Sequence, residues 1–474
     1  MTFAPNAKRS ARPRHRSCTT TCGPLLWFCL LVATKPAMAQ PVPTARTAFV
    51  DVNVVPMDRE RVLPHQTVLV ENGRITAIGA SIRVPKDARV IEGRGTTFLA
   101  PGLADMHTHA HAPEDMRLYL ANGVTTVLDM GEAPNEFMGQ VRPAINRGTR
   151  PGPRIYSAFE VDGSPRYGHF TVTTPDEARW IVRLAKTNGY EFIKVYNNLS
   201  AECFQALLAE GRLQGLPIVG HGVTRLGLER QLDAGQLMVA HTEEFLYTFF
   251  SQPDEPEHAP DPARIPAAIE VIRRNKAFIT ADLNTYATIA RQWGRPDIVA
   301  DYLNQPYARY LSPSLRIEWK HAGYAKRTGD ITPTLDFLKR FTKAMSDASV
   351  PLVLGTDAPT IPGLAPGYSV HEGMRALEEA GLTRYQVLST ATRTPGELIH
   401  RAVPNADTFG TVAVGQRADL ILSGQNPLDD LSTLRKPVGV MVNGVWYADK
   451  DLERLLDDVA ATYGASPEPA HLSR

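Results

Sequence analysis

The sequence predicts an α/β protein with a (β/α)8 TIM barrel and a small β-sandwich domain built from both ends of the chain. Residues 99–400 alternate short apolar runs with amphipathic helical stretches, which is typical of repeated strand-helix units around parallel strands. The two flanks instead contain closely spaced short strands separated by turn residues such as Asn72-Gly73 and Asn443-Gly444. These two patterns predict two domains.

The flanks are β-rich at both ends of the chain. We expect strands at 47–55, 67–70, 74–78, 419–423 and 439–447. Residues 40–98 and residues 401–474, the latter including a tail, are therefore expected to combine into one sandwich beside the central domain.

The central domain contains eight strand-like runs. They lie at 99–106, 124–130, 154–161, 192–196, 217–220, 237–240, 277–283 and 351–355. Eight strand-helix units in one domain predict a closed barrel, in which active sites form at the carboxyl ends of the strands. We therefore expect the catalytic and ligand-binding residues at those ends.

Composition narrows the class of partner. The chain has 474 residues, of which 43% are apolar, so it can bury a large core. Its 51 Lys and Arg against 50 Asp and Glu leave a formal charge of +1, which is too balanced for an electrostatic grip on nucleic acid or anionic lipid. We expect a small-molecule substrate and no nucleic-acid partner. The sequence leaves the oligomeric state open, and a homo-oligomer is possible.

Residues 1–39 have the layout of a secretory signal peptide. A stretch rich in Lys and Arg precedes the apolar run 24–33, and Ala37-Met38-Ala39 forms an A-x-A end before Gln40. About ten apolar residues are too few for a membrane span, which needs roughly 20. We expect cleavage after Ala39, no stable membrane insertion afterwards, and an exported, periplasmic or secreted protein. Cleavage would leave Cys203 as the single cysteine, so no internal disulfide is expected.

Metal-ligating side chains gather at the strand ends. They are His107 and His109 after the first run, Lys194 in the fourth, His221 after the fifth, His241 after the sixth and Asp357 after the eighth. Residues i and i+2 of a strand share a face, so His107 and His109 can project together into the barrel mouth and bind one metal ion. The set predicts a metal site.

The sequence resembles the amidohydrolase superfamily of metal-dependent hydrolases in three features. These are residues 100–109 (APGLADMHTH), the order H-x-H, Lys, His, His, Asp of the potential ligands, and the paired β flanks. The likeness covers nearly all of the chain after the leader. Lys194 followed by the two later histidines resembles the binuclear branch, prolidase-like or imidazolonepropionase-like, in which the lysine is carboxylated.

The resemblance implies two divalent metal ions, with zinc the expected ion. His107, His109 and Asp357 would hold the more buried ion, and His221 and His241 the more exposed one. Lys194 would carry a carbon dioxide-derived carbamate that bridges both, because an ammonium has no lone pair to offer a metal. The alternative for Lys194 is a barrel lysine paired with a nearby acid.

The implied reaction is hydrolysis of an amide or peptide bond in a dipeptide or an N-acyl amino acid. Two cations lower the pKa of a bridging water, and Asp357 would act as general base and proton shuttle. Two alternatives stay open: an ester, lactone or phosphotriester hydrolase with the same site, and a mononuclear deaminase or cyclic-amide hydrolase that does not need Lys194. A non-catalytic binding protein is disfavoured because all six ligands are present.

Substrate contacts are expected on loops after the strands. His169 is expected to contact the carbonyl oxygen or a carboxylate of the substrate and to take part in catalysis. Tyr196 shares the inward face of Lys194, and Arg225 could pair with a carboxylate. Residues 243–262 and 284–350 form long insertions that could shape the pocket. His371 is expected to support the loop after the last strand.

Overall fold

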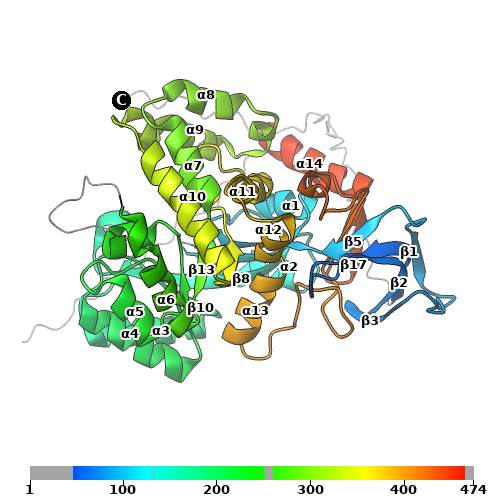
Figure 1. Ribbon diagram of the computed structural model, residues 1–474, viewed down its shortest axis with the longest axis horizontal. Coiled ribbons are helices and arrows are strands. Elements are labelled where there is room, and N and C mark those ends of the chain that lie inside the picture. The colour runs from blue at the N-terminus through cyan, green and yellow to red at the C-terminus, as the bar shows by residue number, and fades with distance from the viewer. Residues whose placement is uncertain (1–45, 132, 251–259, 465–474) are drawn as a thin grey trace, which may run out of the picture. The chain divides into compact units, whose positions relative to one another are not determined.

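The computed structural model describes residues 46–131, 133–250 and 260–464, which form two sheets and the helices that cover them (Figure 1). The predicted leader, residues 1–39, lies outside the described residues. No helix of the described residues is both long enough and apolar enough to cross a membrane.

The first sheet is the predicted barrel. Its parallel strands follow one another in chain order: β6 (Leu103–Thr108), β7 (Val124–Asp129), β8 (Arg154–Asp162), β10 (Phe192–Val195), β11 (Ile218–Gly220), β12 (Met238–Val239), β13 (Phe278–Ala281) and β14 (Leu352–Leu354). The short strand β9 (Phe170–Thr171) adds to β8. A bridge from Thr108 to Ala358 brings the end of β14 back to β6, so the sheet is nearly closed. The (β/α)8 prediction is confirmed.

The second sheet joins the two ends of the described chain, as predicted. Its order is β17-β16-β15-β5-β1-β2-β3, with β4 paired to β1. The strands are β1 (Arg46–Val54), β2 (Leu63–Glu71), β3 (Arg74–Gly79), β4 (Arg89–Glu92), β5 (Phe98–Pro101), β15 (Leu420–Ser423), β16 (Gly439–Val442) and β17 (Val445–Ala448). Phe49 and Trp446 meet edge to face in its core, with ring centroids 5.2 Å apart. The domain is one mixed sheet.

The expected run 99–106 is in fact two strands that belong to different sheets. Residues Phe98–Pro101 pair with β1 and β15, and Leu103–Thr108 opens the barrel. Gly102 separates them, and a Cβ there would lie 2.3 Å from Thr125 Oγ1. The Pro101-Gly102 pair is a turn signal at the break, which the single expected run 99–106 did not take into account.

Helices cover the barrel between the strands. Those before the last barrel strand are α1 (Pro113–Ala121), α2 (Arg142–Asn146), α3 (Pro175–Thr187), α4 (Ala201–Gln214), α5 (Leu228–Ala234), α6 (Ile265–Asn275), α7 (Leu283–Gln292), α8 (Pro296–Asn304), α9 (Pro313–His321) and α10 (Thr332–Asp347). After it come α11 (Tyr368–Glu379), α12 (Arg384–Thr390), α13 (Arg393–Ala402) and α14 (Asp449–Gly464). Helix starts follow local chemistry: Thr174 caps α3 in a capping box with Glu177. The helices α7 to α10, drawn in green and yellow in Figure 1, form the predicted insertion between the last two barrel strands.

The barrel interior is apolar below the site. Its residues include Met106, Leu128, Phe192, Met238 and Val353, all buried. Polar side chains therefore concentrate at the carboxyl ends of the strands, where the predicted site lies.

Candidate active site

The structure brings the predicted metal-ligating side chains together at the carboxyl ends of the barrel strands. His107 Nε2 lies 3.3 Å from His109 Nε2. Asp357 Oδ1 lies 3.4 Å from the first of these atoms and 3.3 Å from the second. The rings of His107 and His241 have centroids 4.5 Å apart, and those of His221 and His241 4.9 Å. Four histidines from three strand ends therefore surround one space.

Three of these residues could hold a metal ion. One ligand atom from each of His107, His241 and Asp357 lies within 4.8 Å of the others. Imidazole nitrogens and a carboxylate oxygen form a donor set suited to zinc. The donors fit a divalent cation.

A β-bulge helps to aim His107. In the β6–β7 pairing, Asp105 faces Val127 and Thr108 faces Asp129, so β6 uses one more residue than its partner. Bulges recur beside active sites because they redirect a side chain. The simple i and i+2 argument for His107 and His109 did not include this irregularity.

Three of the four imidazoles, those of His107, His221 and His241, have an acceptor on Nδ1. His221 Nδ1 lies 2.6 Å from Glu244 Oε1, and His107 Nδ1 lies 3.2 Å from the carbonyl of Ala240. His241 Nδ1 contacts Asp282. Such contacts orient metal ligands and make them more basic.

These carboxylates explain the electrostatics. Burial disfavours the imidazolium of His241, but the charge and hydrogen bond of Asp282 outweigh burial and raise the pKa of His241 to about 10. Burial likewise opposes the ionised form of Glu244, yet His221 lowers the pKa of this carboxyl below its usual range. Sequence reasoning missed Glu244 and Asp282, although each follows a strand end closely.

Asp357 is held in an uncommon backbone conformation beside the histidines. Its φ of 59° lies in the left-handed region, and its N–H donates to the carbonyl of His107 at 2.8 Å. Burial opposes ionisation, but the hydrogen bond from His109 and the nearby imidazoles hold the pKa of Asp357 well below its usual range. Asp357 is thus an anionic group that faces the histidine cluster.

Asp105 ties the first and last barrel strands together under the site. Its Oδ1 accepts from the N–H of His107 at 3.2 Å and of Thr356 at 3.1 Å. Its Oδ2 accepts from Thr356 Oγ1 at 2.6 Å and Tyr119 Oη at 3.1 Å. Burial raises the pKa of Asp105 to about 7. This residue therefore fixes the backbone that carries both His107 and Asp357.

Lys194 is buried and paired with a carboxylate that the sequence reasoning did not select. Its Nζ lies 3.1 Å from Glu160 Oε1 and 3.4 Å from His109 Nε2. Glu160 comes from β8, and an acidic side chain inside an otherwise apolar strand was the available signal. This pairing is the arrangement expected for an unmodified lysine.

The predicted substrate residues lie in different environments. His169 Nδ1 is 3.3 Å from Glu160 Oε2. Tyr196 lies between His169 and His221, with ring centroids 4.6 Å and 4.0 Å away. Arg225 stands exposed in the turn after β11, and no contact joins it to the cluster within the described part of the chain.

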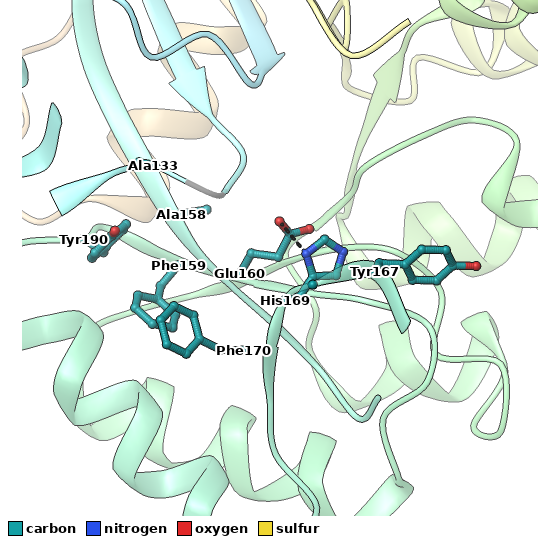
Figure 2. A pocket seen from close by; sticks show the side chains of 9 residues that line it. Ala133, Ala158, Phe159, Glu160, Tyr167, His169, Phe170 and Tyr190 are labelled. Atoms are coloured by element: carbon teal, nitrogen blue, oxygen red, sulfur yellow. Dashed lines mark ion pairs between the residues drawn. The ribbon is translucent and has the colours of Figure 1, made fainter. Parts of the chain in front are cut away.

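A cavity of about 300 Å³ adjoins Lys194 on the side of Glu160 and His169. Figure 2 shows Phe159 and Phe170 beside each other at one end, with Glu160 and His169 facing one another nearby. Tyr190, Tyr167, Ala133, Ala158 and Gly168 complete its lining.

Comparison with known proteins supports the same fold. No model of a protein family matches the sequence. The ochratoxinase of Aspergillus niger is 22% identical over 463 residues, covering 84% of each chain. Among solved structures, a bottromycin amidohydrolase has a TM-score of 0.69 at 23% identity and covers 89% of this chain and 91% of its own. A structure described as a putative prolidase from Bifidobacterium longum has a TM-score of 0.63 at 21% identity, with 88% and 100% covered. The resemblance to amidohydrolase-type proteins is thus confirmed at the level of the fold.

Proposed function

We propose that this protein is an exported, binuclear metal-dependent hydrolase that cleaves an amide or peptide bond in a small molecule, a dipeptide or an N-acyl amino acid. The observation that carries this proposal is the meeting of four histidines, Lys194 and Asp357 in one barrel mouth. The similar proteins described as amidohydrolase, prolidase and Xaa-Pro dipeptidase support the same class of bond.

The donor set would divide between two zinc ions. His107, His109 and Asp357 would hold one ion, and His221 and His241 would hold the other. When bound, the ions supply hydroxide near neutral pH and polarise the scissile carbonyl.

Asp357 performs the proton transfers in this proposal. It is ionised, because the surrounding imidazoles keep its pKa low, so it can accept a proton from the attacking water and return it to the leaving nitrogen. Asp105 and the backbone of His107 hold it in place. His169 and Tyr196 contact the substrate beside the metal pair.

Lys194 would carry the carbamate in the active enzyme. An ammonium that adds carbon dioxide becomes a carbamate anion and releases two protons. Glu160, whose Oε1 lies 3.1 Å from Lys194 Nζ, is placed to accept one of these protons, and His169 contacts the other oxygen of Glu160. The second proton leaves to solvent.

One observation favours a second candidate, a mononuclear deaminase or cyclic-amide hydrolase. Lys194 already has a carboxylate partner in Glu160, which suits a lysine that stays an ammonium and binds no metal. A panel of dipeptides and N-acyl amino acids, set against lactones, a phosphotriester and cyclic amides, separates the substrate classes.

Metal content tests the binuclear proposal directly. Residues 40–474 are prepared with zinc and bicarbonate, as wild type, Lys194→Ala and the control Lys186→Ala, which removes an exposed lysine of α3. We expect about two zinc ions per chain in the wild type and control, and one or none in Lys194→Ala, because the bridging ligand is lost. About one zinc ion in all three proteins would contradict the binuclear site and support the second candidate.

Turnover of Asp357→Asn tests the proton shuttle. The variant keeps an oxygen donor but cannot act as a base, so we expect most of the metal to remain and kcat to fall about 10²- to 10⁴-fold. Undiminished turnover with full metal content would remove Asp357 from this role.

A further inference from the structure

We propose that the cavity beside Glu160 binds an uncharged aromatic substituent of the substrate, and so makes the enzyme selective for aryl-bearing amides. This inference rests on the proposed function, because it names the substrate class of that same site. It assigns a role to Phe159, Phe170 and Tyr190, which the mechanism does not use.

The aromatic walls of the cavity have a shape that suits a further ring. Phe159 and Phe170 have ring centroids 4.9 Å apart with planes tilted by 33°, and Phe159 meets Tyr190 edge to face at 5.0 Å. Rings at such distances and angles attract a further ring in the same way. A volume of about 300 Å³ lies at the lower end of the range for ligand pockets, which suits one substituent of a larger molecule.

Phe170 is unusually open to solvent for a large apolar residue. The residue is 60% exposed, although the parallel pairing of β9 with β8 holds it in place. Tyr167, on the same loop, is 44% exposed. Large apolar surface that is fixed and left open to water gains free energy when an apolar ligand covers it.

Glu160 connects the cavity with the proposed reacting groups, because it lines the cavity and also contacts Lys194 Nζ at 3.1 Å. Figure 2 shows Glu160 and His169 between the Phe159–Phe170 pair and Tyr167. A substituent in the cavity would therefore lie on the Lys194 side of the histidine cluster.

Charge favours an uncharged group in this cavity. Glu160 is the one carboxylate among the described lining residues, and Lys194 pairs with it, so it leaves little net charge to attract a cationic group. An acidic substituent would meet Glu160 without an arginine or lysine among the lining residues. An uncharged aromatic group fits both conditions.

The test measures binding as well as turnover. Calorimetry with zinc-loaded protein compares 3-phenylpropionate with propanoate, which share a carboxylate and differ in the phenyl ring. Kinetics compares N-phenylacetylglycine with N-acetylglycine, and Ala-Phe with Ala-Ala, so that a ring on either side of the amide is sampled.

The variants are Phe170→Ala, which removes a wall, and Ala133→Leu, which fills the cavity. Trp180→Ala is the control, since Trp180 is a 68% exposed aromatic residue on α3 outside the lining.

We expect the wild type and Trp180→Ala to bind 3-phenylpropionate at least about 10-fold more tightly than propanoate. In at least one of the two substrate pairs, kcat/KM should be higher by a similar factor for the substrate that carries the ring. Both preferences should fall to about two-fold or less in Phe170→Ala and Ala133→Leu.

The two proposals can fail separately. Amide turnover without an aryl preference, or with a preference that survives in both cavity variants, overturns the aromatic subsite and leaves the proposed function standing. Phenyl-dependent binding that requires Phe170, without turnover of any amide, supports the subsite and overturns the amide reaction.

Discussion

At the scale of single residues, buried polar groups in and near the site have specific partners that set their charge. Asp282 and Glu244 orient His241 and His221, and Glu160 pairs with Lys194. Without such partners, groups of this kind would pay a large desolvation cost. Outside the metal cluster, His371 illustrates the same rule with a measurable consequence.

His371 is buried at the start of α11, where its Nε2 lies 3.0 Å from the carbonyl of Asn122. This contact joins the first turn of α11 to the residue that ends α1; the expected support of the loop after the last barrel strand stays a prediction. Burial lowers the pKa of His371 to about 4. The folded protein therefore binds fewer protons there than the unfolded chain at pH values between about 4 and 6.5.

This shift predicts a loss of stability in acid. The contribution of His371 is complete above about pH 6.5 and is lost as the pH falls toward 4, because the unfolded chain then gains the proton first. Between pH 7.5 and pH 5 we expect wild type to lose about 2 kcal/mol more unfolding free energy than His371→Gln. Urea unfolding of both proteins at the two pH values, with metal content held equal, measures the difference. Parallel losses in the two proteins would show that His371 is not the cause.

At the scale of elements, the insertion between β13 and β14 braces the segment that carries Asp357. Trp319 of α9 is buried, and its Nε1–H donates to the carbonyl of Pro359 at 3.0 Å. Gln292 of α7 donates to the carbonyl of Pro362 at 3.0 Å. The sequence predicted that residues 284–350 could shape the pocket, and within it these contacts give the insertion a positioning role.

Trp319→Phe tests this positioning role. The variant keeps an aromatic ring but removes the N–H donor, so the partly buried carbonyl of Pro359 loses its partner and the Asp357 segment is less well fixed. We expect kcat to fall several-fold while KM changes less than two-fold and metal content stays constant. Trp293→Phe is the matched control, because Trp293 Nε1–H also donates to a carbonyl, that of Thr328, within the same insertion. Equal effects of the two substitutions would argue for a general loss of stability.

At the scale of the whole molecule, the second sheet links distant parts of the chain to the site. Strand β5 pairs with β1 and with β15, and only Gly102 separates it from β6, which leads to His107. Residues from both flanks therefore anchor the first strand of the barrel. This pairing explains why both flanks carry the same short strands.

The proposed export is also a property of the whole chain. Expressed from residue 1 in a secreting bacterial host, the protein should appear outside the cytoplasm with Gln40 as its first residue. Ala39→Arg should block this cleavage, because the A-x-A end needs a small residue at that position. N-terminal sequencing and intact mass measure both outcomes. An uncleaved wild-type chain in the cytoplasm would contradict export.

The sequence by itself determined the barrel and the flanking sheet, and it singled out the six side chains that the structure brings together at the strand ends. Each depends on a local pattern: apolar period, turn residues, or a potential ligand side chain in or directly after a strand. These patterns involve residues that are close together in the sequence, so they can be recognised before the fold is known.

Only the tertiary structure decided how those side chains are supported. Glu160 and Asp282 stand out in the sequence only as acidic residues in or directly after a strand, and Trp319 has no local signal; each becomes significant through a partner 34 to 41 residues away. The cavity of Phe159, Phe170 and Tyr190 likewise depends on packing between separate segments. Contacts of this kind are set by the closure of the barrel, which no single stretch of sequence encodes.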